Sequence, residues 1–180
     1  MATAAQSIKP LATQRQGKYL VFQLAREEFG VQVLKVREIM GLQEITSVPQ
    51  TPDFVKGVIN LRGKVIPVVD LRRKFGLDDA EYTQRTCIIV VQVKQVAGPV
   101  LMGAVVDGVS EVLNIQESEI EDMPDFGADM TLPYVMGMAK VKGKVKILLD
   151  IDRVLTSLEV TSLAMLPDLQ PLANGGTATN

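Results

Sequence analysis

The fold follows from one stretch of 22 residues, Phe54-Val-Lys-Gly-Val-Ile-Asn-Leu-Arg-Gly-Lys-Val-Ile-Pro-Val-Val-Asp-Leu-Arg-Arg-Lys-Phe75. The same pattern returns 80 residues later, over Tyr134–Leu155, with seven identical positions. Because a second set of residues also recurs in the same order, we interpret the chain as an internal duplication of two similar units. That second set, at an offset of 73, pairs Gly30, Val33, Val36 and Glu38 with Gly103, Val106, Val109 and Glu111.

The repeated residues predict the same local structure in both copies. Gly63 and Gly143 suit the positive φ of a tight hairpin turn. Asp70 and Asp150 each stand between a β-rich run and a helical run, where an N-cap residue is expected. Gly76 is placed to end the first helix as its C′ residue. Chance similarity between two β-rich stretches is the alternative, and the agreement of glycines, aspartates and order weighs against it.

Most of the remaining sequence predicts β-strands. Apolar spacing of three or four residues predicts one or two helical turns at Val36–Met40 and a helix from Asp150 to about Leu163. Pro67 has no N–H to give to a ladder, so its part of a strand should lie at an edge or a bulge. Three hairpins are expected, Tyr19–Ala25 with Phe29–Val33, Val58–Arg62 with Lys64–Val69, and Thr86–Val93 with Val100–Val106.

The composition excludes several classes of function. The 180 residues include no His and a single Cys, which removes Ser-His-Asp and Cys-His relays, His-ligated metals and internal disulfides. The 19 basic and 21 acidic residues are dispersed, which argues against a nucleic-acid surface. No apolar run reaches the roughly 18 residues that span a bilayer. We therefore expect a soluble globular protein without direct membrane insertion.

Three local patterns resemble chemical sites only in part. Gly57–Lys64 departs from the G-x-x-x-x-G-K-[ST] phosphate loop, so a hairpin turn is favoured. The acidic run Glu117–Asp122 lacks the glycine turn of a Ca²⁺ loop, and a solvated face is favoured. Cys87 opens an apolar strand and has no His to activate it, so a packed thiol is favoured. The sequence thus predicts no cofactor, no metal and no enzyme activity.

Four motifs occur in order along the chain: Phe29-Gly-Val-Gln-Val-Leu-Lys-Val-Arg-Glu-Ile39, Gly57-Val-Ile-Asn-Leu-Arg-Gly63, Val65-Ile-Pro-Val-Val-Asp-Leu71 and Val105-Val-Asp-Gly-Val-Ser-Glu-Val112. Together they resemble the CheW family of bacterial chemotaxis coupling proteins, over about residues 18–158. The histidine kinase CheA carries the same domain but needs a phosphoacceptor His, which this chain lacks. The resemblance is therefore to the adaptor and not to the kinase.

The resemblance implies a mainly β fold of two similar SH3-like five-stranded β-barrels packed together, with short helices and a C-terminal helix. It implies a non-enzymatic, cytoplasmic scaffold that binds the cytoplasmic tip of methyl-accepting chemoreceptors and the regulatory domain of CheA, with other CheW-like domains as further partners. Such a scaffold reaches membrane-bound receptor arrays through these partners. The expected divisions are tails at 1–17 and 167–180, a first barrel at about 18–83, a second at about 84–150, and a helix at about 150–163.

The resemblance also implies a receptor-binding groove between the barrels. A charge-assisted hydrogen bond between Glu38 and Arg62 would help to shape it. The alternative is that Arg62 is a solvated hairpin residue and the valines belong to the core. The expected groove residues are Val36, Glu38, Arg62, Val65, Gly103, Val109 and Val112.

Two further surfaces follow from the same resemblance. The kinase-facing side would use the outer strands of the first barrel, with Val33 and Ile45 as apolar contacts. An array-linking surface would include Glu121 and Phe126.

Two other functions remain open from the sequence. One is a CheW-like adaptor for another kinase pathway, such as surface motility or second-messenger control. The other is an SH3-like module that binds nucleic acid or a small ligand, for which the chain lacks a basic patch and interleaved aromatic residues.

Overall fold

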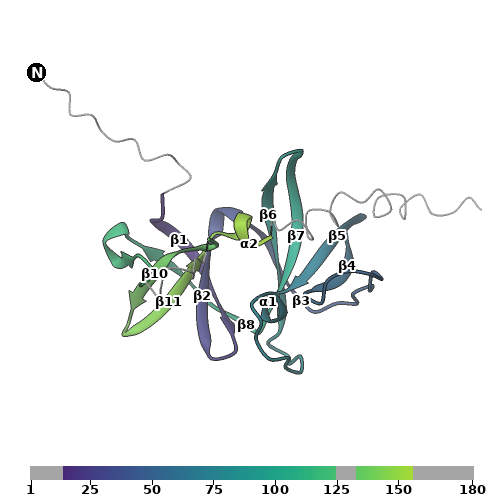
Figure 1. Ribbon diagram of the computed structural model, residues 1–180, viewed down its shortest axis with the longest axis horizontal. Helices are drawn as coiled ribbons and strands as arrows, with labels where there is room; N and C mark the ends of the chain where they lie inside the picture. The colour runs from purple at the N-terminus through teal and green to yellow at the C-terminus, as the bar shows by residue number, and fades with distance from the viewer. Residues whose placement is uncertain (1–13, 125–132, 156–180) are drawn as a thin grey trace, which may run out of the picture.

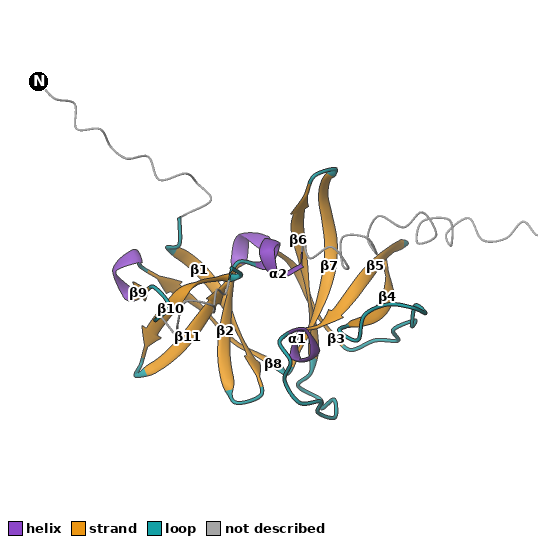
Figure 2. Cartoon of the chain, viewed as in Figure 1, coloured by secondary structure: helices purple, strands orange, loops and turns teal. Residues whose placement is uncertain are grey.

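The computed structural model describes residues 14–124 and 133–155, and these residues are mainly β, as the sequence predicts (Figure 1, Figure 2). Two short α-helices, α1 (Leu71–Lys74) and α2 (Ile151–Leu155), and two 3₁₀ turns, η2 (Val33–Lys35) and η3 (Glu117–Glu119), accompany the strands. The strands are β1 (Gly17–Leu24), β2 (Glu27–Gln32), β3 (Val36–Gly41), β4 (Val55–Leu61), β5 (Lys64–Asp70), β6 (Cys87–Gln95), β7 (Gly98–Val106), β8 (Gly108–Ile115), β9 (Ile120–Glu121), β10 (Val135–Val141) and β11 (Lys144–Leu149).

The strands form two mixed sheets that lie side by side in Figure 1. Sheet A, on the left, has the order β8-β1-β2-β11-β10-β9, and sheet B, on the right, has the order β3-β6-β7-β5-β4. Each contains one parallel pair, β2 with β11 in sheet A and β5 with β7 in sheet B. The two sheets match the expected pair of similar β units, and the two-residue strand β9 makes six strands in sheet A where five were expected.

The sheets do not follow the expected division of the barrels at residues 83 and 84. Sheet B is continuous in sequence from β3 to β7, and it is inserted between β2 and β8 of sheet A. Each repeat unit therefore gives its first two strands to one sheet and its remaining strands to the other. The repeat showed that the two units are alike, but it carried no information on which unit's strands would pair with each other.

The expected helical turns at Val36–Met40 are wrong, because these residues form strand β3, which pairs antiparallel with β6. Burial alternates along β3, as in a strand with one face toward the protein. Ile39 lies on the outward face and is 46% exposed. Because Ile39 is apolar although it faces outward, the apolar residues Val36, Ile39 and Met40 have the spacing of one face of a helix.

The expected hairpins are present, and their turns explain the repeated glycines. Arg62 and Gly63 have φ of 50° and 85°, and the equivalent Lys142 and Gly143 have 54° and 76°. Two consecutive positive φ angles are those of a type I′ turn, whose twist matches the flanking strands. Pro67 pairs with β4, while the pairing of β5 with β7 covers only Val68–Asp70, so Pro67 lies outside that ladder.

A second pair of repeated glycines allows each sheet to close on itself. In sheet B a bridge joins Thr46, after β3, to Val58 of β4, and in sheet A strand β9, after β8, pairs with β10. A Cβ at Gly57 would lie 2.0 Å from the Thr46 carbonyl oxygen, and one at Gly137 would lie 2.8 Å from the Glu121 oxygen. Both closures therefore need a residue without a side chain.

The two aspartates cap the two helices as expected. The Arg72 N–H donates to the Asp70 carboxylate at 2.9 Å, and the Asp152 N–H donates to Asp150 at 3.1 Å. Gly76, with φ of 72°, follows the end of α1. Helix α2 is described as far as Leu155, and the rest of the predicted helix lies outside the described residues.

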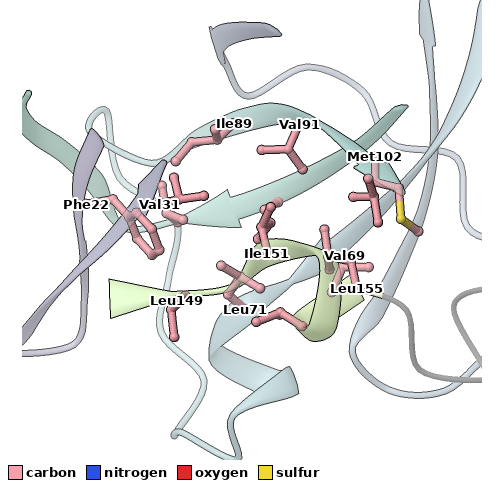
Figure 3. Packing of buried hydrophobic residues seen from close by; sticks show 14 of the residues in the cluster. Phe22, Val31, Val69, Leu71, Ile89, Val91, Met102, Leu149, Ile151 and Leu155 are labelled. Carbon is pink, nitrogen blue, oxygen red and sulfur yellow. The ribbon is translucent and has the colours of Figure 1, made fainter. Parts of the chain in front are cut away.

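The main hydrophobic core lies between the two sheets and belongs to both of them (Figure 3). It takes Phe22 and Val31 from sheet A and Ile89 and Met102 from sheet B. Helices α1 and α2 fill the space between the sheets with buried aliphatic side chains, and burying each such side chain contributes about 1.5–3 kcal/mol. The helix residues in this core are Leu71, Ile151, Val154 and Leu155.

A row of four aromatic rings extends this core. Phe22 stacks on Phe29, Phe29 on Phe75 and Phe75 on Tyr134, with centroid separations of 5.9, 5.9 and 5.3 Å. The row joins the β1–β2 hairpin to the end of α1 and to the residue before β10. It therefore ties sheet A to the helix that follows sheet B's strand β5.

Ion pairs fix the two places where the described chain passes between the sheets. At the crossing from β7 to β8, Asp107 accepts from the Arg72 guanidinium at 2.6 Å and from the Ala25 N–H at 2.7 Å. These bonds join the start of α1, the crossing itself and the β1–β2 turn.

The crossing from β2 to β3 has the equivalent arrangement with the charges reversed. Lys35 in η2 donates to Asp152 of α2 at 2.7 Å, and the Lys94 N–H donates to the same carboxylate at 2.8 Å. Asp152 is the repeat equivalent of Arg72. Each crossing is thus held to the second residue of a helix by one salt bridge.

Gly57→Ala should lower the free energy of unfolding by at least about 2 kcal/mol, because the new Cβ meets backbone and φ there is +143°. Urea denaturation followed by far-UV circular dichroism measures this loss. Gly41→Ala is the matched control, because a Cβ at Gly41 meets no atom within 4 Å. Equal stability of the two variants would contradict the closure argument.

Arg72→Ala should cost about 2 kcal/mol, because it leaves the Asp107 carboxylate, 29% exposed, without its guanidinium partner. The neighbouring Arg73→Ala should cost clearly less than Arg72→Ala, since Arg73 pairs with the exposed Asp79. Thermal and urea unfolding of both variants check the difference. If Arg73→Ala proves as costly as Arg72→Ala, the salt bridge at the crossing is not what distinguishes them.

Candidate functional site

An open groove of about 480 Å³ lies at one end of sheet B. Its floor is apolar, with Val90 and Leu101 packed into or against the core of that sheet. Its rim is polar and carries more positive than negative side chains. The rim residues are Arg37 and Glu38 of β3, Arg62 and Lys64 at the β4–β5 turn, and Gln92 of β6.

The expected pair between Glu38 and Arg62 is present in this groove. The Arg62 Nη2 donates to the Glu38 Oε1 at 2.9 Å. The Arg62 side chain is 76% exposed, so the pair adds little to stability. The hydrogen bond holds the guanidinium of Arg62, which lies in the type I′ turn between β4 and β5, against the outer strand β3.

The pair has a weaker counterpart on the other sheet. Lys142, the repeat equivalent of Arg62, lies 4.0 Å from Glu111, the repeat equivalent of Glu38. The duplication thus placed a charged pair at the same turn in both sheets. The two pairs differ in the cation and in the length of the contact.

The groove was expected between the two barrels, whereas all residues that line this one belong to sheet B or to its β4–β5 turn. The other residues expected in the groove are spread over the fold. Val36 and Val109 are half-buried and pack against the core shared by the two sheets. Val65 is half-buried and packs against Val55 and Val58 in a small cluster.

Two more of the expected groove residues differ sharply in exposure. Gly103 is buried between neighbouring strands, and a Cβ there would lie 2.9 Å from the Ile88 Cγ2. Val112 lies on β8 in sheet A and is 55% exposed. Thus Glu38 and Arg62 meet in one groove, while Gly103 is part of the packed interior.

Several groove residues were not found from the sequence. Arg37 donates to the Gln92 Oε1 at 2.7 Å and lines the groove beside Glu38. Burial alternates along β3, so a strand pattern would place Arg37 and Glu38 on opposite faces. The pairing of β3 with β6 shifts register between Val36 and Glu38, and the long Arg37 side chain still lines the groove. The groove residues on β6 and β7 could not be found from the sequence, because only the pairing of the strands brings them next to β3 and the β4–β5 turn.

The residues expected to face the kinase lie in different surroundings. Val33, in η2, is half-buried and packs against the shared core, whereas Ile45 packs against the core of sheet B. Leu34, beside Val33, is 85% exposed and was not singled out in the sequence. Val33 and Leu34 line a small apolar pocket of about 250 Å³ next to β1.

Of the residues expected to link arrays, Glu121 lies on the short strand β9 and is exposed. The Lys140 ammonium lies 3.5 Å from its carboxylate. Phe126 lies outside the described residues.

The local patterns noted in the sequence are accounted for by packing and turns. The loop at Gly63 is the tight β4–β5 turn. Burial raises the pKa of the Cys87 thiol, which favours the unreactive protonated form. Within residues 14–124 and 133–155, no three His, Cys, Asp or Glu side chains are grouped so as to hold a metal ion. In the same part of the chain no helix has the length and apolar character to cross a bilayer.

Comparison with known proteins agrees with this architecture. Residues 18–159 match the family described as the CheW-like domain. The chain is 38% identical to the chemotaxis protein CheW of Klebsiella aerogenes, over 86% of this chain and 91% of that protein. It is 37% identical to the chemotaxis protein CheW of Rhizobium meliloti, over 78% and 88% of the two chains. The crystal structure of the scaffolding protein TtCheW from Thermoanaerobacter tengcongensis superimposes with a TM-score of 0.69 and 34% identity, over 80% of this chain and 95% of that chain. The chain therefore belongs to the CheW family of chemotaxis scaffold proteins.

Proposed function

We propose that this protein couples chemoreceptors to the histidine kinase CheA as a non-enzymatic cytoplasmic scaffold. The observation that carries the proposal is the Glu38–Arg62 pair at the rim of an apolar groove, on the two-sheet framework of a CheW-like domain. In this function the protein transmits signals by binding two partners at once. It reaches the membrane only through the receptors.

The receptor tip binds at the sheet B groove. Its apolar floor offers burial for aliphatic side chains, and the rim offers a guanidinium already held in place. A side chain that is fixed before binding loses less conformational entropy when the partner arrives. Val36, Val65, Gly103, Val109 and Val112, which the resemblance also assigns to receptor binding, do not line this groove.

The regulatory domain of CheA binds around η2. Val33 and Leu34 form a small apolar surface beside β1, and the side chain of Leu34 is exposed to solvent. Ile45 adds a half-buried apolar contact next to the core of sheet B. An exposed apolar residue that adjoins an apolar pocket forms a contiguous apolar surface, and such surfaces mark protein interaction sites.

A third surface, around Glu121 and Phe126, links the protein to other CheW-like domains in a receptor array. The exposed position of Glu121 on an outer strand supports this role.

A reconstitution tests the coupling. Chemoreceptor membranes and CheA should show several-fold faster autophosphorylation of CheA when this protein is added. Arg62→Ala should weaken receptor binding about tenfold and reduce the stimulation, because about 1.4 kcal/mol of contact energy is lost.

Lys142→Ala is the matched control for Arg62→Ala, because it removes a cation from the same turn position with nearly the same φ. Both variants should melt within a few degrees of the wild type. Unchanged receptor affinity in Arg62→Ala, or equal losses in both variants, would contradict the receptor role of the groove. Absence of any stimulation by the wild-type protein would favour an adaptor in another kinase pathway.

Leu34→Glu should weaken binding to the CheA regulatory domain at least about tenfold without loss of stability, because Leu34 is 85% exposed. Val33→Glu should weaken binding and also lower the melting temperature, because Val33 packs against the shared core. Isothermal titration calorimetry and thermal melting separate the two effects. Val96→Glu, at the exposed β6–β7 turn, is the control and should leave binding unchanged. Full kinase affinity in Leu34→Glu would exclude η2 from this interface.

A further inference from the structure

A buried ion pair joins the two parallel strands of sheet A. The Lys146 side chain on β11 is 4% exposed, and its ammonium lies 3.1 Å from the carboxylate of Glu28 on β2, whose side chain is 17% exposed. The two residues are also register partners in the ladder between β2 and β11, which lie side by side in sheet A (Figure 1). Within the described ranges, Lys146 is the only lysine or arginine that is buried. The contact therefore lies in the packed interior and not on the surface.

The equivalent position of sheet B is apolar. The repeat equivalent of Lys146 is Ile66 of β5, and that of Glu28 is Leu101 of β7. Ile66 belongs to the core of sheet B, and Leu101 packs against that core. Strands β5 and β7 form the parallel pair of sheet B, as β11 and β2 do in sheet A. At this position, one sheet thus has two aliphatic side chains and the other has two opposite charges.

The interior of sheet A has room for the longer charged side chain. Ala139 of β10 is fully buried and is the register partner of Lys146 on the other side of β11. In sheet B the equivalent partner of Ile66 is Ile59, which is also buried. Because protein interiors are closely packed, the small alanine beside Lys146 makes space for the lysine chain. The ion pair is therefore part of the packing of sheet A.

The charges distinguish between two ways of pairing the repeat units. In the alternative arrangement each unit would complete its own sheet, with β2 beside β5 and β7 beside β11. The equivalent register would then bring Lys146 next to Leu101, and Glu28 next to Ile66. A buried charge that has lost its partner is strongly destabilising. The apolar pattern of the repeat fits both arrangements, so the ion pair is what separates them in free energy.

We propose that the Lys146–Glu28 pair selects β2 as the partner of β11 and so fixes the exchange of strands between the two sheets. The inference goes beyond the proposed scaffold function, because it concerns how the chain chooses its fold and holds without any binding partner. A buried ion pair adds little net stability relative to a well-packed apolar pair. Its effect is therefore on which strands pair.

The test removes the charges and determines which strands pair after refolding from urea. The double variant Glu28→Leu with Lys146→Ile gives sheet A the residues of the equivalent position in sheet B. NMR spectra should show a second set of amide resonances in at least about a tenth of the molecules, with nuclear Overhauser contacts between β2 and β5. The wild type should show one set, with contacts between β2 and β11. The control, Glu121→Leu with Lys140→Ile, makes the same changes in the exposed pair of β9 and β10 and should keep one set.

A second double variant, Glu28→Leu with Leu101→Glu, moves the carboxylate from β2 to β7 and keeps Lys146. It should shift most molecules to the pairing of β7 with β11. If one of the two variants does not fold, the other decides.

A single set of resonances with contacts between β2 and β11 in the variants that fold would overturn the proposal. A second set in the control would also overturn it, because added apolar side chains alone would then explain the mixture. Loss of folding in both variants would do the same, because the pair would then be needed for stability and not for the choice of partner.

Discussion

The structure depends on one hydrophobic core that two sheets share. Neither repeat unit holds a complete sheet, because β1 and β2 pair with β8 and β11 while β6 and β7 pair with β3 and β5. The apolar faces of both sheets, together with α1 and α2, meet in the same buried cluster. A small sheet of this size cannot bury enough apolar surface alone. Interleaving the two units solves this problem, and it also places a turn and an outer strand from one unit against the hairpin of the other, where the groove forms.

The sequence predicted what local chemistry determines. Gly63, Gly143, Asp70 and Asp150 were placed correctly because a positive φ and a free helix N-terminus each demand particular residues. The exchange of strands could not be predicted, since the two units are similar and either partner would satisfy the pattern. The helical interpretation of β3 failed because Ile39, an apolar residue, faces solvent. In each case the missing information was the identity of the neighbouring strand.

The candidate site likewise contains some residues that were predicted correctly from the sequence and others that were not. Glu38 and Arg62 were selected by the family resemblance, and their opposite charges then predicted the hydrogen bond that the structure shows. Gly103 was expected in the groove, yet it lies in the interior, where its lack of a side chain admits Ile88. Arg37 was missed because an alternating strand would direct it away from the face of Glu38, whereas its side chain also lines the groove where the pairing of β3 with β6 shifts register. Strand pairing and bulges thus decide which of several polar residues meet, and neither can be obtained from one sequence.

The two short crossings have a mechanical consequence. The described chain passes between the sheets through the three residues of η2 and through Asp107, and a salt bridge holds each passage to a helix that is buried between the sheets. Bending one sheet against the other would have to break both bridges and expose the common core. The domain should therefore carry force between its partners as a stiff body. A change at a bound receptor would then reach the kinase as a displacement of the whole scaffold, with little lost to internal flexing.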